Sequence, residues 1–500
     1  MIRSSRSSYV LAVVALGGGI AAAQPPHPPA PVPHTAAVPN AALKLPFKDD
    51  ARIEFVAAVN KAEWAKLTAF WNEATEEATD PVGGKVARRV VRIKVPLGLS
   101  KAPDVPPENP MTVAKWALGK RLYYDKVLSA NGKVACATCH DPKKGFTDQL
   151  PVSLGINDEK GGINAPTVVN SAYHKFQFWD GRATSLEDQS QGPVGNPKEM
   201  FAGGGDAWEG AVKRLRQSPE YVKQFEQVFG HAPTRDAAAK AIAAYERTVL
   251  VGNSVYDRAE AAMKKRVADD DAEEAKLKPA DFAKVLKQAF AAMDTNALKS
   301  LGLDPDRDVA KADAVGAKLA SGRALFFGKA RCSNCHVGDN FTDLTFHNLG
   351  AGAKDGVLPE AEYARFAALP TGHKDPAMIG GQKTPGLRGL LDTAPYLHDG
   401  SEKTLEGVID FYDRGGNVNE FLDPKMRDTE AEAKIARAWA SGQKISLPEG
   451  AIKTRDGSPV IPFKLNLTGD EKADLVLFLK ALQGDPVDPT VADPGWFPKK

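Results

Sequence analysis

All four cysteines of this 500-residue chain lie in two Cys-x-x-Cys-His segments. This spacing lets two thiols add to the two vinyl groups of one haem while the adjacent histidine reaches the iron. The pattern therefore predicts two covalently bound c-type haems, which supply peroxide and electron-transfer chemistry that side chains alone do not provide. The expected haem-binding residues are Cys136, Cys139 and His140 at the first site and Cys332, Cys335 and His336 at the second.

Two other uses of these cysteines fit the pattern less well. A structural zinc site draws four ligands together, whereas the two segments lie far apart in the chain and each carries its own histidine. A thioredoxin-type redox pair occurs in a βαβ context and needs no histidine. Haem attachment is therefore the favoured interpretation.

The N-terminus has the pattern of a secretory signal peptide, residues 1–23. Arg3 and Arg6 precede an apolar run from Tyr9 to Leu16, and small residues form a cleavage site before Gln24. An uncleaved membrane anchor is the alternative. Because haem is attached to such segments outside the cytoplasm, we expect a periplasmic protein.

Composition limits the partners. The formal net charge is +2, which gives no case for binding nucleic acid or an acidic membrane surface. No other apolar stretch is long enough to span a bilayer, so no membrane span is expected in the mature chain. Residues 24–50 include a proline-rich segment and are predicted to form an extended tether.

The haem segments belong to a longer internal repeat. Residues 118–125 (LGKRLYYD) and 320–328 (ASGRALFFG) share a Gly-basic-x-Leu-aromatic-aromatic pattern, and Phe-Thr-Asp recurs at 146–148 and 341–343. Each half then has a late amphipathic helix, predicted at 236–250 and 470–482. The second of these opens with Thr468 and Glu471 in capping-box spacing.

This repeat predicts a mostly α fold with two cytochrome c-type haem domains packed face to face. Strand-like alternation is scarce apart from short pieces such as Val90 to Val95. The expected parts are an N-terminal helical extension (51–85), a first haem domain (86–259), a helical insertion (260–312), a second haem domain (313–486) and a C-terminal tail (487–500).

Six ordered segments carry a resemblance to a known family. They are CATCHDPKKGFTD (136–148), NAPTVVN (164–170), FWDGRATSLEDQ (178–189), NPKEM (196–200), FTDLTFHNLG (341–350) and TAPYLHDG (393–400). On these segments the chain, from about Pro96 to Gly484, resembles the bacterial diheme cytochrome c peroxidases and their MauG-like relatives.

The resemblance implies a role for each matched position. His140 would hold the haem that reacts with peroxide, and His336 the haem that passes electrons to it. Glu199 matches a distal acid, which would shuttle a proton during oxygen–oxygen cleavage, and Gln189 matches a distal amide. Trp179 matches an aromatic residue between the haems.

The resemblance also implies a calcium ion between the domains. Its ligands would be the side-chain oxygen of Asn164 and the carbonyls of Thr393 and Pro395, completed by water. Composition and spacing alone do not indicate this site.

The chain departs from the peroxidase pattern in the loop after the first haem segment. Many family peroxidases have a histidine there that caps the resting iron. Here no histidine occurs between His140 and His174, and Ile156 and Asn157 are poor iron ligands. We therefore expect an open first haem that needs no reductive activation, with His174 as a less favoured ligand.

A second departure concerns the distal ligand of the second haem. The position at which peroxidases have a methionine is Tyr412 here, which is the MauG-like pattern. A phenolate is harder and more anionic than a thioether, so it lowers the haem potential. Met378 and Met426 are the competing ligands. His347 and His398 are expected to orient groups near the second haem.

Three functions remain open at this stage. The first is a peroxidase that reduces hydrogen peroxide with electrons from a small cytochrome c or cupredoxin. The second is a MauG-like enzyme that oxidises residues of a partner protein. The third is a non-catalytic electron-transfer diheme cytochrome, which would leave Glu199 and Gln189 without a purpose. The resemblance also suggests a homodimer.

Overall fold

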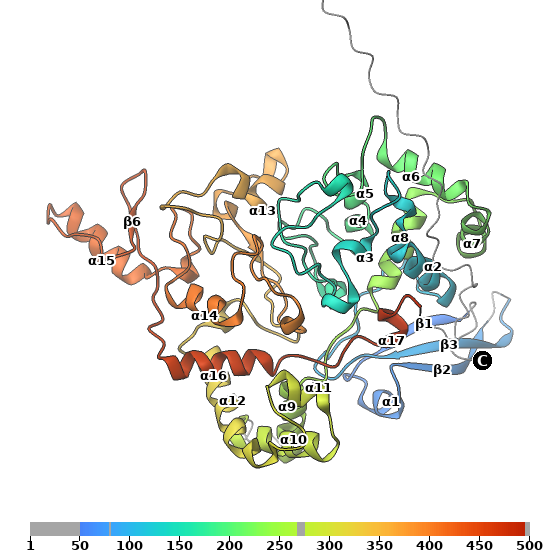
Figure 1. Cartoon of the computed structure of the whole chain (residues 1–500), viewed down its shortest axis with the longest axis horizontal. Coiled ribbons are helices and arrows are strands. Elements are labelled where there is room, and N and C mark those ends of the chain that lie inside the picture. Colours follow the sequence, from blue (N-terminus) through green and yellow to red (C-terminus); the bar gives the residue numbers. More distant parts are fainter. Residues whose placement is uncertain (1–50, 80–81, 268–275, 496–500) are drawn as a thin grey trace, which may run out of the picture. The chain divides into compact units, whose positions relative to one another are not determined.

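The computed structural model of the protein describes residues 51–79, 82–267 and 276–495 (Figure 1). The predicted signal peptide and the tether (24–50) lie outside the described residues. Within the described ranges, no helix is long and apolar enough to cross a membrane.

Helices dominate the chain, as predicted, and the sheets are small. The first half contains α2 (Val113–Tyr124), α3 (Cys136–Cys139), α4 (Leu186–Gln189), α5 (Gly192–Gly195), α6 (Ala207–Arg216), α7 (Pro219–Phe229) and α8 (Arg235–Glu246). The second half contains α12 (Ala312–Phe327), β4 (Phe346–His347), α13 (Ala364–Ala368), β5 (Gln382–Lys383), α14 (Leu405–Asp413), α15 (Thr429–Ala440), β6 (Ile452–Lys453), β7 (Pro459–Val460) and α16 (Gly469–Lys480).

The two halves use the same helix pair, which confirms the predicted repeat. In the first half α2 packs against α8, and in the second half α12 packs against α16 (Figure 1). A β-carbon on Gly119 would lie 1.8 Å from the carbonyl oxygen of Ala241, and one on Gly322 would lie 2.0 Å from that of Asp474. The repeated glycine therefore lets each pair of backbones touch. The capping box of Thr468 and Glu471 is also present at the start of α16.

Replacing the repeated glycine should therefore destabilise the fold. We expect Gly322→Ala to lower the free energy of unfolding by about 1–3 kcal/mol, because α12 and α16 must separate to admit the methyl group. Chemical denaturation of the holoprotein measures this change. Gly469→Ala is the matched control, since nothing lies within 4 Å of a β-carbon there. Equal stability of the two variants would contradict the packing argument.

The N-terminal extension is not helical, so that prediction was wrong. It forms a three-stranded sheet of β1 (Arg52–Val56), β2 (Trp71–Thr79) and β3 (Lys85–Lys94), with only a short helix α1 (Lys61–Lys66). β3 is the central strand, parallel to β1 and antiparallel to β2. The glutamates and alanines of β2 favour helix locally, but the pairing with β3 overrides that preference. The predicted strand-like piece at 90–95 lies largely within β3.

The described part of the insertion is largely helical, as predicted, and contains α9 (Val255–Arg266), α10 (Pro279–Ala291) and α11 (Thr295–Ser300). Its predicted start at 260 falls inside α9. The insertion is also less solvated than a charged segment suggests, because α10 buries Phe282, Leu286 and Phe290 in one apolar cluster with residues of α12. The insertion therefore packs as part of the second half.

The described part of the C-terminal segment is fixed to the first half rather than free. It contains α17 (Pro489–Ala492), and Val491 is fully buried in the core beside Trp116 and Tyr245. The ammonium group of Lys120 donates to the carbonyls of Thr490 and Asp493. The prediction of a simple tail at 487–500 was therefore incomplete.

Candidate functional site

Both Cys-x-x-Cys-His segments line one cavity of about 430 Å³. This volume is in the range of small-molecule and cofactor sites. Of the six predicted attachment residues, Cys136 alone is absent from the wall, and it packs against the core beside α2. The wall also contains every other predicted site residue: Asn164, Trp179, Gln189, Glu199, Thr393, Pro395 and Tyr412.

The two histidines are oriented in the same way. Nδ1 of His140 lies 3.3 Å from the carbonyl oxygen of Phe146, and Nδ1 of His336 lies 2.8 Å from that of Phe341. A carbonyl can only accept, so Nδ1 carries the proton and Nε2 keeps a lone pair for a metal. Burial lowers the pKa of both imidazoles, which favours the neutral form that binds iron.

The cavity also suits the rest of a haem. Its wall is mostly apolar, as a porphyrin face requires. The wall also contains basic side chains whose charge suits the propionate carboxylates, among them Lys198 and Arg331. The residues present therefore fit two haems attached at the two segments.

Glu199 is held in the wall by its own loop and by the loop after the first haem segment. The amide of Asn196 donates to its carboxylate, and the backbone N–H of Ile156 donates to its carbonyl over 2.8 Å. Gly155 permits this contact, since a β-carbon there would lie 1.9 Å from the carbonyl oxygen of Lys198. Burial raises the pKa of the Glu199 carboxyl despite the nearby charge of Arg182.

The loop after the first haem segment packs partly into the apolar core. Ile156 is 1% exposed and belongs to an apolar cluster with Val194 and Met200. His174 does line the cavity, but its Nδ1 accepts from the ammonium group of Lys383 over 2.9 Å. Burial lowers the pKa of Lys383 to about 7. His174 is thus engaged with the second half of the chain.

Trp179 contacts one of the predicted calcium ligands, Asn164, and lies close to His398. The indole N–H of Trp179 donates to the carbonyl of Asn164 over 2.9 Å, and the Trp179 ring lies 6.3 Å from that of His398. Among the described residues, no hydrogen bond is accepted by Oδ1 of Asn164 or by the carbonyls of Thr393 and Pro395. These three oxygens therefore remain available to a cation.

Two side chains compete for the distal position at the second haem. Tyr412, on α14, lines the cavity, and burial raises its pKa, with the Cys335 and Cys332 side chains adding to the effect. Met426 lines the same cavity, although sequence reasoning placed it outside the matching helix. Met378 is not part of the cavity wall. The choice between Tyr412 and Met426 therefore stays open.

His347 and His398 make ion-pair contacts, which explains why neither is needed as an iron ligand. Nδ1 of His347 lies 2.7 Å from Asp423, and its Nε2 lies 2.8 Å from Asp343. Burial opposes a charge on His347, but these carboxylates outweigh it and raise its pKa. His398 contacts Glu362 over 2.8 Å.

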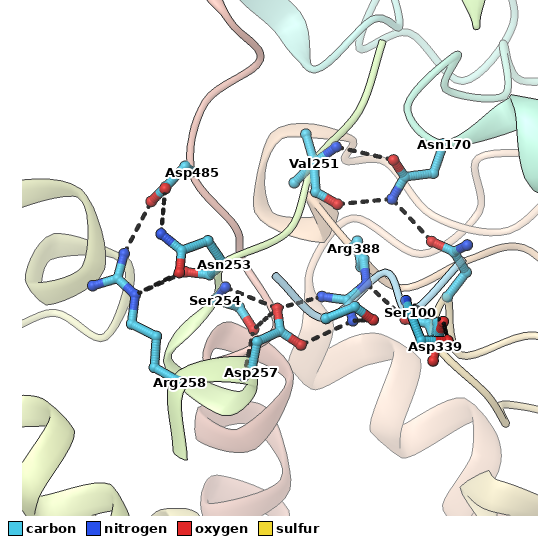
Figure 2. Close-up of polar contacts among 12 residues, drawn as sticks. Ser100, Asn170, Val251, Asn253, Ser254, Asp257, Arg258, Asp339, Arg388 and Asp485 are labelled. Carbon is cyan, nitrogen blue, oxygen red and sulfur yellow. Dashed lines mark hydrogen bonds and ion pairs between the residues drawn. The ribbon is translucent and has the colours of Figure 1, made fainter. Parts of the chain in front are cut away.

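A buried ion pair fixes the loop that follows His336 (Figure 2). The guanidinium of Arg388 binds both carboxylate oxygens of Asp257 at 2.6 and 2.9 Å, and the two side chains are 3% and 2% exposed. Its Nε also donates to the carbonyl of Asp339 over 2.7 Å. The amide of Asn170 adds a bond of 2.9 Å to Asn340. The loop after His336, at Asp339 and Asn340, is thus fixed by Asn170, which precedes the second haem segment, and by Arg388, which follows it.

Sequence reasoning missed the ion pair and Lys383. Arg388 lies in a loop without a local pattern. Asp257 forms a capping box with Ser254, a pattern that indicates a helix start and not an ion pair with a distant arginine. The only sequence signal related to these contacts was the internal repeat, because it predicted two domains that pack against each other.

Comparisons with known proteins agree with this site. The model of the family described as "Di-haem cytochrome c peroxidase" matches residues 113–265. Cytochrome-c peroxidase IdrP1 of Pseudomonas sp. (strain SCT) is 33% identical over 359 residues, which cover 66% of this chain and 82% of that protein. The chain belongs to the di-haem cytochrome c peroxidase family. Membership implies two c-type haems.

Some similar proteins are named MauG or MauG-like rather than peroxidase. Methylamine utilization protein MauG of Methylorubrum extorquens is 32% identical, over 66% of this chain and 78% of that protein. The crystal structure of a MauG-like protein associated with microbial copper homeostasis has a TM-score of 0.54 and 28% identity, and covers 79% of this chain and 97% of that one. Similarity at this level does not separate the predicted activities.

Proposed function

We propose that this chain is a periplasmic diheme peroxidase that reduces hydrogen peroxide with electrons from a small redox protein. The observation that carries the proposal is the position of Glu199. It lies in the wall of the cavity that contains His140, its pKa is raised by burial, and the adjacent loop offers Ile156 in place of a capping histidine. A carboxyl of this kind is a proton shuttle for a bound peroxide.

Each predicted side chain at the first site has a separate role in the proposed reaction. His140 binds through Nε2 because Phe146 holds its other nitrogen. A haem bound there supplies the redox chemistry that cleaves peroxide. Glu199 takes the proton from the inner peroxide oxygen and delivers it to the outer oxygen, which leaves as water. Gln189, in the same wall, would hydrogen-bond the peroxide and orient it.

Trp179 lies where an electron route between the sites would pass. Its indole is fixed by Asn164 from the first half, and its carbonyl accepts from the backbone N–H of Lys383 in the second half over 2.7 Å. We infer that the second site delivers electrons past this residue. A small cytochrome c or cupredoxin would supply them.

The second candidate function is MauG-like oxidation of residues in a partner protein. Tyr412 in the cavity wall favours it, as does the open position in the loop of Ile156. The similarity to MauG and to the MauG-like protein adds support. A third function, electron transfer without catalysis, gives no role to Glu199.

The identity of the distal ligand leads to a testable difference. If Tyr412 binds the second iron, we expect Tyr412→Phe to raise the reduction potential of that haem and to change its low-spin electron paramagnetic resonance (EPR) signal, because an anionic ligand is lost. Met426→Leu should leave both unchanged. A spectrum altered by Met426→Leu and not by Tyr412→Phe would instead assign the methionine.

The calcium proposal predicts a response to chelation. Removal of the ion with EDTA should release Asn164 and so loosen Trp179, which slows peroxide turnover and changes the EPR spectrum. Added Ca²⁺ should restore both, and Mg²⁺ should not, since it demands a smaller octahedral shell. Metal analysis of the purified holoprotein that finds no calcium would reject the site.

Steady-state kinetics test the proposed function. The holoprotein should consume peroxide in the presence of a reduced small cytochrome c, with one peroxide used for every two donor molecules oxidised. Fast reaction with peroxide but no turnover with any such donor would favour the MauG-like function. A holoprotein that does not react with peroxide would reject both catalytic functions and would favour electron transfer without catalysis.

A further inference from the structure

A row of oxidisable aromatic rings runs from the first haem segment to the N-terminal sheet. The hydroxyl of Tyr123 donates to the carbonyl of His140 over 2.8 Å. The ring of Tyr123 lies 4.8 Å from Tyr245, which lies 6.3 Å from Trp116, which lies 5.1 Å from Trp71. All three distances between ring centres are those of direct contact. Trp71, on β2, is the only member of the row that is partly exposed.

The internal repeat shows that packing alone does not require these residue types. Tyr123 and Phe326 occupy the same position after the repeated glycine, and the first pair of rings has its counterpart in Phe326 and Phe478, 5.3 Å apart. The position of Trp116, three residues before that glycine, is Leu319 in the second half. At these matching positions the second half has phenylalanine and leucine, which resist oxidation. The half that would react with peroxide has tyrosine and tryptophan instead.

Hydrogen bonds show where an oxidised ring could lose a proton. Tyr123 and Tyr245 donate to backbone carbonyls, which are poor bases, and burial raises the pKa of both phenols. The indole N–H of Trp116 donates to the hydroxyl of Thr248. Trp71 differs, because its indole N–H donates to the carboxylate of Asp488 over 3.0 Å. An oxidised indole at Trp71 can therefore be stabilised by passing its proton to Asp488.

We propose that this row conducts single electrons from the protein surface toward the first haem site, and that Trp71 is a second oxidation site for soluble one-electron donors. One electron leaves Trp71 and passes through Trp116, Tyr245 and Tyr123, while the indole proton moves to Asp488. A donor molecule then returns one electron to Trp71, and the proton moves back. Hydrogen peroxide is the oxidant: two electrons passed singly along the row, together with two protons from solvent, convert one peroxide into two waters, so the inference rests on the proposed function.

The test treats the holoprotein with hydrogen peroxide in the absence of a donor. Peptide mass mapping should find oxygenated tryptophan concentrated at Trp71. Trp64 and Trp439 are the internal controls, because they are also partly exposed and lie outside the row. Rapid-freeze EPR should show a tryptophan radical that changes when the protein contains deuterated tryptophan.

Variants then test the route. Trp116→Phe and Tyr245→Phe keep a ring in place but replace an oxidisable side chain with one that resists oxidation, so each should lower oxygenation of Trp71 several-fold. The initial reaction of the haem with peroxide, followed by stopped-flow absorption, should not change. Trp208→Phe, a buried tryptophan of the same half outside the row, is the matched control.

The outcomes separate this inference from the proposed function. Oxygenation of Trp71 no greater than that of Trp64 and Trp439, or unchanged in Trp116→Phe, would overturn the route while the haem still reacts with peroxide. A haem that does not react with peroxide at all would overturn the proposed function and, with it, this inference.

Discussion

Glu199→Gln should keep both haems and lose most peroxide reactivity. Loss of a positioned proton shuttle typically slows a reaction by about 10²–10⁴-fold, and the amide cannot take the proton of a bound peroxide. The absorption spectrum and the haem content should match those of the unchanged protein, because Glu199 is not one of the predicted attachment residues. Stopped-flow measurement of the peroxide reaction gives the rate.

The pH dependence supplies an independent check on Glu199. Burial raises the pKa of its carboxyl above the ordinary value of 4.5, so the carboxylate that accepts a proton is lost as the pH falls through that raised pKa. The rate should therefore decline on the acid side, and this decline should vanish in Glu199→Gln. Glu159→Gln, an exposed acid in the adjacent loop, should retain both the rate and the decline. A Glu199→Gln variant that reacts at the normal rate would remove Glu199 from the mechanism.

Asp257→Ala should cause the largest loss of stability among the substitutions considered. Removing one partner of a buried ion pair costs about 3–5 kcal/mol, because the other charge is left without compensation. Arg388 would also lose the contact that aligns its Nε with the carbonyl of Asp339, next to the ligand loop of His336. We therefore expect a lower free energy of unfolding in chemical denaturation and a changed low-spin EPR signal of the second haem.

Arg258→Ala is the matched control for this prediction. Arg258 lies on the same helix as Asp257 and pairs with Asp485 (Figure 2). It also pairs with Asp294. Its side chain is 23% exposed, so its loss should cost about 1 kcal/mol or less. It does not contact the loop after His336, and the EPR signal should stay the same. Equal effects of both variants would show that the Arg388 pair has no particular link to the second haem.

The helical repeat was predictable because its signals are local. Gly119 and Gly322 precede matching aromatic pairs, and the late helices have clear apolar periodicity. The N-terminal sheet was not predictable in this way. The residues of β2 are ordinary helix formers, and their strand conformation depends on the distant partner β3. Long-range pairing of this kind leaves little trace in a single stretch of sequence.

For the site, too, local sequence motifs were predictable and long-range contacts were not. The predicted site residues, apart from Cys136, line one cavity, and they were predictable because each lies in a segment with its own pattern. The partners of those residues did not show in the sequence. The carbonyl of Phe341 that orients His336 depends on the local backbone geometry. The contact between Lys383 and His174 depends on the packing of the two halves of the chain against each other. Met426 also lines the cavity because of how the chain folds, and its position in the sequence did not indicate this.

Low-temperature EPR of the oxidised holoprotein, before and after peroxide, tests the central claim most directly. An open first haem beside Glu199 predicts a high-spin ferric signal that disappears when peroxide is added, together with a separate low-spin signal from the second haem. Two low-spin signals that do not respond to peroxide would contradict the account, because both irons would then be fully coordinated and Glu199 would have no substrate.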